Sequence, residues 1–347
     1  MSPMPSGRDA PRPYRPAWWL PGRHLRTLWG RLGRRIPVVA TRRERLDTPD
    51  GDVLELDRLD GPAADAPRLV VLHGLEGTPQ SRYARGALAE AERRGWGADL
   101  LYFRSCAGTL NRARRLYHSG ETSDLAFVVE HLVREHPRSP LVFAGFSLGG
   151  NVLLKWLGER GTGLPPQVRG AAAVSVPFDL ARGARHIGKG FARVYEASFL
   201  RSLKRKTLAK LEQYPDLTDP VRLARSRSIY EFDDAVTAPV HGFRSADDYY
   251  ARSSSLGYLA AIRIPTLLLS AADDPFLPAA VLGEVHTIAT RTPALTLEFV
   301  PRGGHVGFVM GPPWRPFYYA EWRVAEFLAE VLDTASHGRH PLASAHV

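Results

Sequence analysis

One short segment joins a buried-strand pattern to a tight turn around a serine: Leu141-Val142-Phe143-Ala144-Gly145-Phe146-Ser147-Leu148-Gly149. The first four residues are apolar, and apolar residues at helical spacing continue from Leu148. A strained strand-to-helix turn brings the positions two residues before and after its centre against neighbouring backbone, which favours glycine at both. The segment therefore predicts an exposed Ser147 hydroxyl at the end of a strand. The alternative is a turn of a nucleotide-binding fold, but no G-x-G-x-x-G motif or Walker-type lysine accompanies it.

Strand and helix patterns alternate on both sides of this segment. Short apolar runs occur at residues 68–73, 98–103, 171–176, 266–270 and 295–300, and helical spacing occurs at residues 84–94, 125–133 and 148–157. This alternation is typical of βαβ units on a parallel sheet. Because the runs are apolar on both faces, we expect helices to cover both faces of the sheet. The sequence predicts an α/β fold with a mostly parallel central sheet.

Strand patterns are absent between about residues 178 and 258, where basic and aromatic helix-like stretches and prolines replace them. Because this stretch is too long for a bare loop, we predict a helical insertion, or cap, over the C-terminal edge of the sheet. Residues 17–335 are predicted to form one domain that contains this cap. Residues 1–16 and 336–347 are predicted to be flexible ends.

A serine hydroxyl needs a base to become a nucleophile, and the base needs an acid to orient it. His305 follows the last strand pattern across a glycine turn, so we predict that it is the base. Asp274 follows the strand at residues 266–270 and is our choice for the acid, with Asp273 and Asp179 as alternatives. The order Ser147, Asp274, His305 is that of the α/β-hydrolases.

A developing oxyanion needs backbone amides beside the serine. We predict that the amide of Leu148 is one donor and that of Leu75, in the glycine-containing loop at residues 73–77, is the second. His73 could be mistaken for the base, but we expect it to bind loop backbone. Cys106 is an alternative nucleophile that we discount, because Ser147 already occupies the tight turn.

Composition sets outer limits on the function. The 347 residues carry a formal net charge of +10, and the single cysteine excludes an internal disulfide and cysteine-ligated zinc. No uncharged apolar stretch approaches the roughly 20 residues that a membrane-spanning helix needs. The N-terminus has no apolar signal-peptide core, and we expect a cytoplasmic protein.

Two charged or aromatic segments raise the question of partners. The arginines are scattered along the chain and form no single basic block. Residues 201–210 are expected to form a solvated helix face and not a nucleic-acid groove, because aromatic residues are not interleaved with the basic ones. The Trp18-Trp19-Leu20 cluster, with nearby arginines, is expected to pack against the domain. A peripheral membrane contact through this cluster is the alternative.

Several further motifs carry a resemblance to a known family, namely residues 18–24, 73–77, 103–108, 117–124, 145–151, 272–276 and 303–308. The chain resembles the branch of the α/β-hydrolase superfamily that contains the bacterial YheT-like hydrolases and the animal ABHD1 and ABHD3 proteins, the AB hydrolase 4 family. Two departures are visible: Leu25-Arg26-Thr27 stands where the family usually has a glutamine before the threonine, and Ser105 where it usually has glycine. The resemblance implies that Ser147, Asp274 and His305 form the charge-relay system.

Together these observations predict a serine hydrolase that cleaves carboxylic esters through an acyl-enzyme. The alternatives are a phospholipase or acyltransferase that uses the same three residues, and a non-catalytic binding protein with the same fold. The chemistry needs no metal and no organic cofactor. The expected partner is a small-molecule ester or lipid substrate.

Overall fold

The computed structural model describes residues 13–336 and has at its centre an eight-stranded sheet of order β1-β2-β4-β3-β5-β6-β7-β8. The strands are β1 (Arg42–Asp47), β2 (Val53–Leu59), β3 (Arg68–Leu72), β4 (Gly97–Tyr102), β5 (Leu141–Phe146), β6 (Val168–Val174), β7 (Thr266–Ala271) and β8 (Leu295–Val300). Neighbours from β4 to β8 pair in parallel, whereas β2 is antiparallel to both β1 and β4. The predicted α/β fold with a mostly parallel sheet is confirmed.

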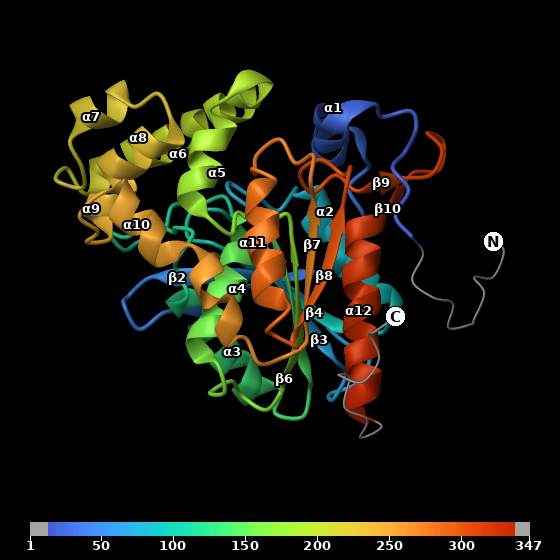
Figure 1. Cartoon of the computed structure of the whole chain (residues 1–347). Coiled ribbons are helices and arrows are strands. Elements are labelled where there is room, and N and C mark those ends of the chain that lie inside the picture. The colour runs from blue at the N-terminus through green and yellow to red at the C-terminus, as the bar shows by residue number, and fades with distance from the viewer. Residues whose placement is uncertain (1–12, 337–347) are drawn as a thin grey trace.

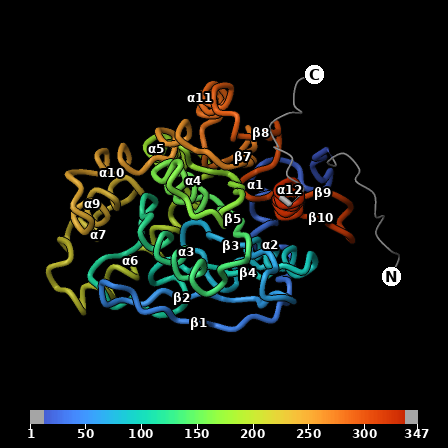
Figure 2. The backbone as a smooth tube through the Cα atoms, turned by 90° about the horizontal axis from the view of Figure 1, so that it is seen from below, coloured from blue at the N-terminus to red at the C-terminus, as the bar shows by residue number. Residues whose placement is uncertain are grey.

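Helices cover both faces of this sheet (Figures 1 and 2). On one face pack α3 (Ser123–Glu135), α4 (Leu148–Arg160) and α11 (Ala280–Ala289). On the other face pack α2 (Arg82–Arg93) and α12 (Tyr319–Ser336). The carboxyl ends of the parallel strands therefore meet at one edge, between the two layers.

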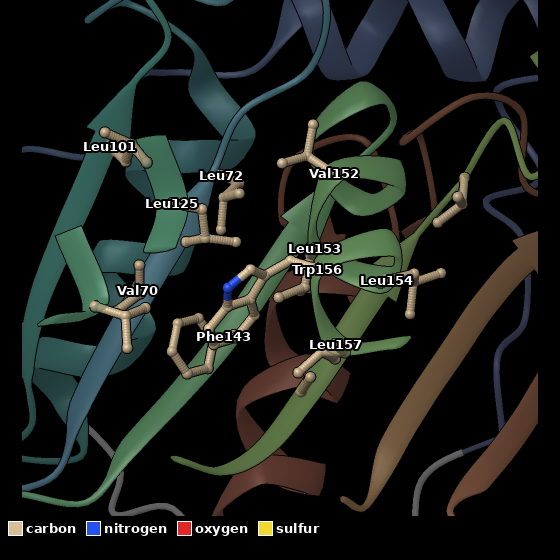
Figure 3. Close-up of a cluster of buried hydrophobic side chains, with 14 of the residues drawn as sticks. Val70, Leu72, Leu101, Leu125, Phe143, Val152, Leu153, Leu154, Trp156 and Leu157 are labelled. Atoms are coloured by element: carbon tan, nitrogen blue, oxygen red, sulfur yellow. The ribbon is translucent and has the colours of Figure 1, made fainter. Parts of the chain in front are cut away.

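Helix α4 holds the serine turn in place because it is buried on every side. All residues from Leu148 to Leu157 are buried, and most of them are apolar, as expected for a helix inside the core. Figure 3 shows Leu153 and Trp156 of α4 beside Phe143 of β5, and the rings of Trp156 and Phe143 lie 5.6 Å apart. Strand and helix on either side of Ser147 are thus locked together.

Two details of the sheet differ from the sequence prediction. Strands β1 and β2 were not predicted, because both contain charged residues and neither is an apolar run. In β2 the charged Arg58 is buried, and its Nε donates to Asp99 Oδ1 at 2.7 Å. Strand β8 has α11 against the face of Leu297 and Phe299 and α12 against the face of Glu298, but it is less buried than expected. It is the edge strand, and only Leu295 in it is buried.

Between β6 and β7 the chain forms only helices and turns. The elements are α5 (Leu180–Ile187), η2 (Gly190–Ala192), α6 (Arg193–Gln213), α7 (Pro220–Arg225), α8 (Ile229–Phe232), η3 (Asp233–Thr237), α9 (Ala238–Val240), α10 (Ala246–Ser253) and η4 (Ser255–Ala261). In Figure 1 α5 to α10 lie at the upper left, beside and above the sheet. We propose that this segment is the cap expected from the sequence.

The two ends of the chain lie mostly outside the described residues. This applies to the predicted flexible ends at residues 1–16 and 336–347, of which residues 13–16 and 336 are described. The ring of Tyr14 lies 5.1 Å from that of Tyr319, so the chain already contacts the domain there. After α1 (Gly22–Leu28) and η1 (Trp29–Gly33) it enters β1, and near its end a short hairpin, β9 (Val309–Met310) and β10 (Phe317–Tyr318), precedes α12. Within residues 13–336, no helix is both long and apolar enough to cross a bilayer.

Candidate active site

Ser147 lies in the turn between β5 and α4 with φ of 51° and ψ of −120°, a conformation that L-residues rarely adopt. The flanking glycines make this turn possible. A Cβ added to Gly145 would lie 2.7 Å from the oxygen of Gly149, and one added to Gly149 would lie 2.5 Å from the oxygens of Leu72 and His73. Both positions therefore require glycine for the packing reason that the sequence suggested.

The structure brings Ser147, His305 and Asp274 together. His305 Nε2 lies 2.9 Å from Ser147 Oγ, and His305 Nδ1 lies 2.8 Å from Asp274 Oδ2. This arrangement fits an imidazole that donates its Nδ1 proton to the carboxylate and accepts the serine hydroxyl proton at Nε2. The ring of Phe276 stacks on His305 with centroids 4.1 Å apart, which fixes the plane of the imidazole.

The two adjacent carboxylates have different partners. Asp274 is 2% exposed, and its other oxygen accepts from the amide of Phe276 at 2.8 Å. Asp273 Oδ1 accepts from the amides of Gly303 and Gly304 at 2.7 and 2.9 Å. Asp273 thus anchors the loop that carries the imidazole and is not its partner.

The third candidate acid, Asp179, lies away from the imidazole. It caps α5 by accepting from the amide of Arg182 at 2.9 Å, and it pairs with the Arg182 guanidinium.

The N-terminal segment supports the histidine loop from the other side. Thr27 Oγ1 accepts from the amide of His305 at 2.9 Å and donates to the oxygen of Arg23 at 2.8 Å. Arg26 Nη1 donates to Asp273 Oδ2 at 3.1 Å. Sequence reasoning assigned no role to Thr27 or Arg26, because nothing in their spacing indicates contact with a loop near residue 305.

The loop after β3 offers one free amide beside Ser147. The amide of Gly74 donates to Tyr83 Oη at 2.7 Å, and that of Glu76 donates to Tyr117 Oη at 3.0 Å. Between them, the amide of Leu75 has no hydrogen-bond partner among the described residues. A Cβ added to Gly74 would lie 3.2 Å from Ser147 Cβ, so this loop adjoins the serine.

The amide of Leu148 belongs to the first residue of α4, and both Leu75 and Leu148 line the cavity described below. An amide in the first turn of a helix has no hydrogen-bond partner within the helix and forms part of the positive end of the helix dipole.

His73 has a structural position. Its Nδ1 lies 2.7 Å from the oxygen of Gly74, and its Nε2 accepts from the amide of Phe103 at 3.2 Å. Burial lowers the pKa of His73 to about 4, so the ring is neutral near pH 7. The expectation that His73 binds loop backbone is confirmed.

A buried ionic cluster connects the cap to the loop of Leu75. Glu76 has φ of 55°, and its carboxylate accepts from Lys206 Nζ and Tyr117 Oη, each at 2.8 Å, and from Ser202 Oγ. Lys206 and Ser202 belong to α6. This cluster was not predicted, because a contact between residues 130 positions apart leaves no local pattern in the sequence.

The cluster also corrects the reading of residues 201–210. They were expected to form a solvated face, but Lys206 is largely buried and Lys210 is fully buried, where it donates to the oxygen of Asn111.

Cys106 lies beside this cluster and is buried, with its Sγ 3.4 Å from Lys206 Nζ. Burial raises the pKa of the Cys106 thiol to about 11. We therefore expect the native protein to react with iodoacetamide at pH 8 at least about a hundredfold more slowly than a free thiol, because so little thiolate is present. Mass spectrometry of alkylated protein measures this, with the urea-unfolded chain as the fast-reacting control. Rapid labelling of the folded protein would contradict the burial of this thiol.

A cavity of about 460 Å³ opens over Ser147 and His305, between the sheet edge and the cap. Its walls are mainly apolar, with Leu180, Ile187, Phe199 and Leu203 among the lining residues. The lining also includes polar groups from the cap, among them His241 and Asp233. Burial lowers the pKa of His241 to about 4 and raises that of Asp233 to about 6, and in both cases it disfavours the charged form. The volume is in the range of sites for small organic ligands.

Comparison with known proteins places these features in a family. The profile of the alpha/beta hydrolase fold matches residues 67–312. The chain is 40% identical over 318 residues to the Escherichia coli (strain K12) protein YheT, whose name assigns it as an esterase, covering 90% of this chain and 92% of YheT. It is 29% identical over 305 residues to the phospholipase ABHD3 of Mus musculus, covering 86% of this chain and 73% of that protein.

Among solved structures, the Pyrococcus furiosus esterase Pf2001 superposes with a TM-score of 0.56 at 17% sequence identity. The match covers 86% of this chain and 98% of the esterase, and it supports the fold alone.

Proposed function

Because the chain belongs to the α/β-hydrolase fold family, and to its branch that includes YheT and ABHD3, we propose that it is a serine hydrolase acting on carboxylic esters. The observation that carries this proposal is the pair of contacts at His305, 2.9 Å to Ser147 Oγ and 2.8 Å to Asp274, at the floor of an apolar cavity. A serine, an imidazole and a carboxylate in this arrangement perform acyl transfer on several unrelated folds.

The first half of the reaction forms an acyl-enzyme. His305 Nε2 takes the proton of Ser147 Oγ as that oxygen bonds to the ester carbonyl carbon, and Asp274 stabilises the imidazolium. The carbonyl oxygen becomes an oxyanion, which the amides of Leu75 and Leu148 bind. When the carbon–oxygen bond to the alcohol breaks, His305 returns the proton to the departing oxygen.

The second half releases the acyl group. A water gives a proton to His305 and adds to the acyl carbon, and Ser147 recovers its proton as the carboxylic acid leaves. An alcohol in place of this water would give acyl transfer, which is the main alternative activity.

The apolar wall of the cavity favours an ester with a hydrocarbon acyl chain. Among relatives of this chain are a protein named phospholipase ABHD3 and one named monoacylglycerol lipase, from Saccharomyces cerevisiae. Lipid esters are therefore the substrate class that we place first, and the cap is the part of the chain that would select among them.

Two measurements on the purified protein test this proposal. A fluorophosphonate probe should label Ser147, identified by peptide mass spectrometry, and a series of p-nitrophenyl esters should show which acyl length gives the highest kcat/KM. Absence of labelling and of ester turnover would contradict the proposal and favour a non-catalytic binding protein. A sharp rise in rate with phospholipid micelles over soluble esters would favour the phospholipase alternative.

The link between Lys206 and Glu76 gives a further prediction. In a Lys206→Met variant, Glu76 keeps a buried charge without its cation, and we expect the loop of Leu75 to shift. We expect kcat to fall about tenfold and the free energy of unfolding to drop by about 3 kcal/mol. Steady-state kinetics and urea unfolding measure the two effects.

The matched control for this prediction is Lys204→Met on the same helix, whose ammonium binds the oxygens of Ala224 and Ser226 within the cap. If the two variants lose the same activity, Glu76 does not position the loop.

A further inference from the structure

We propose that the face around the mouth of the cavity docks on a lipid layer with anionic headgroups. The first observation is where apolar side chains are exposed. Eight of the ten exposed large hydrophobic side chains of the described residues lie in three segments, residues 18–38, 191–194 and 314. We call these segments the mouth face. Its eight exposed apolar residues are Trp18, Leu25, Leu32, Ile36, Val38, Phe191, Val194 and Trp314.

The three segments adjoin in space, although they are far apart in the sequence. The rings of His24 and Phe191 lie 4.7 Å apart, which joins α1 to the start of the cap. Trp19 Nε1 donates to the oxygen of Gly311 at 2.8 Å, which joins the N-terminal segment to the turn that carries Trp314. Figure 1 shows α1 and the β9–β10 hairpin near each other at the upper right, next to the upper end of the sheet.

Some aromatic and aliphatic side chains of the N-terminal segment and the hairpin are packed, whereas neighbouring tryptophans are exposed. Trp19 packs on Trp29 with ring centroids 4.6 Å apart, and Leu20 is buried, so the expected packing of the aromatic cluster holds for these two residues. Trp18 and Trp314 are 76% and 80% exposed. Exposed tryptophans beside a packed apolar base are typical of surfaces that insert into the headgroup region of a bilayer.

The mouth face leads into the cavity. Leu32 and Ile36 both line the cavity and are 66% and 39% exposed, so their side chains form part of its rim. A lipid ester leaving a bilayer at this rim would pass from one apolar environment to another without crossing water. The other two exposed large hydrophobic side chains of the described residues, Leu208 and Val221, lie on α6 and α7, outside the mouth face.

Charge on the mouth face selects the kind of lipid. The mouth face together with its flanking residues, that is residues 13–43, 180–195 and 299–320, contains no aspartate or glutamate. Their exposed basic side chains include Arg15, Arg23, Arg31, Arg35, Lys189, Arg193, Arg302 and Arg315. Arg185 is also exposed but pairs with Asp247. A basic surface with exposed tryptophan and aliphatic groups complements anionic headgroups above an apolar layer. A nucleic acid would match the charge but would leave the aliphatic side chains uncovered.

Sedimentation with phosphatidylcholine vesicles, with and without phosphatidylglycerol, tests the proposal. We expect binding to the vesicles with phosphatidylglycerol, and we expect added salt to weaken it. Two double variants, Trp18→Ser with Trp314→Ser and Arg35→Glu with Arg193→Glu, should each weaken it about tenfold or more. None of these four residues lines the cavity.

The matched controls make the same changes elsewhere. Leu208→Ser with Val221→Ser removes exposed apolar groups from the far part of the cap, and Arg138→Glu with Arg169→Glu reverses exposed charges at the opposite end of the sheet. Both should bind vesicles like the wild type. Thermal unfolding confirms that every variant is folded.

Three outcomes would overturn the proposal: no vesicle binding, equal binding by the mouth-face and control variants, or a concentration-dependent dimer that the tryptophan variants abolish. The last outcome would show that a second copy covers this face. The test does not depend on catalysis, since a Ser147→Ala variant should bind vesicles like the wild type. If ester hydrolysis persists while vesicle binding fails, only the docking proposal falls.

Discussion

A Ser147→Ala variant is expected to lose ester hydrolysis by about four to six orders of magnitude in kcat, the range for removal of a serine nucleophile. Ser147 Oγ donates to His305 Nε2, the ring whose Nδ1 contacts Asp274, and no second hydroxyl is placed 2.9 Å from that imidazole among the described residues. The substitution keeps Cβ and the backbone contacts of the turn, so the thermal unfolding midpoint should change little. Kinetics with a p-nitrophenyl ester and differential scanning calorimetry measure the two quantities.

Ser270→Ala is the matched control. This serine is also buried, at the end of β7, and its Oγ has no hydrogen-bond partner among the described residues. Its loss should leave kcat unchanged. If the Ser147 variant kept more than about a hundredth of wild-type activity, another group would have to be the nucleophile.

An Asp274→Asn variant is expected to lower kcat by about three to four orders of magnitude while KM changes little. The asparagine oxygen can still accept from the amide of Phe276, which turns its NH₂ group toward His305 Nδ1. That contact favours the imidazole tautomer with its proton on Nε2, which cannot accept the proton of Ser147. The loss therefore comes from a misplaced proton in an intact site.

The neighbouring Asp273→Asn variant is the discriminating comparison. Its amide oxygen can still accept from the amides of Gly303 and Gly304, so the histidine loop keeps its main anchor. We expect a loss of about tenfold or less, because the NH₂ group that replaces Asp273 Oδ2 cannot accept the hydrogen bond from Arg26. Equal losses in the two variants would mean that the carboxylates share the role of the acid.

The parts of the site that could be predicted are those that local sequence encodes. Gly145 and Gly149 mark the serine turn because backbone packs against both, and the glycine turn before His305 marks a loop at the end of a strand. The sequence favoured Asp274 as the acid but left Asp273 as an alternative, since both follow β7. The assignment depends on which carboxylate accepts from the amides of Gly303 and Gly304 and which contacts the imidazole of His305.

Other features depend on contacts between distant segments. The pairing of Glu76 with Lys206 and the support of His305 by Thr27 join positions with no shared periodicity. Strand β2 was missed for a related reason. Its Arg58 is compatible with burial because Asp99, Glu44 and Glu135 pair with it, and a single strand's composition does not show those partners.

The Lys206–Glu76 ion pair limits how the entrance can be engineered. If α6 swung outward like a lid to admit a bulkier molecule, it would pull the ammonium from the carboxylate and release the loop that carries Leu75. A variant in which α6 opens more easily would then admit larger esters, but it would hydrolyse them more slowly. Substituting Leu32 or Ile36 at the rim by a smaller residue is a better way to widen the substrate range. These substitutions leave the Lys206–Glu76 ion pair and the loop of Leu75 in place.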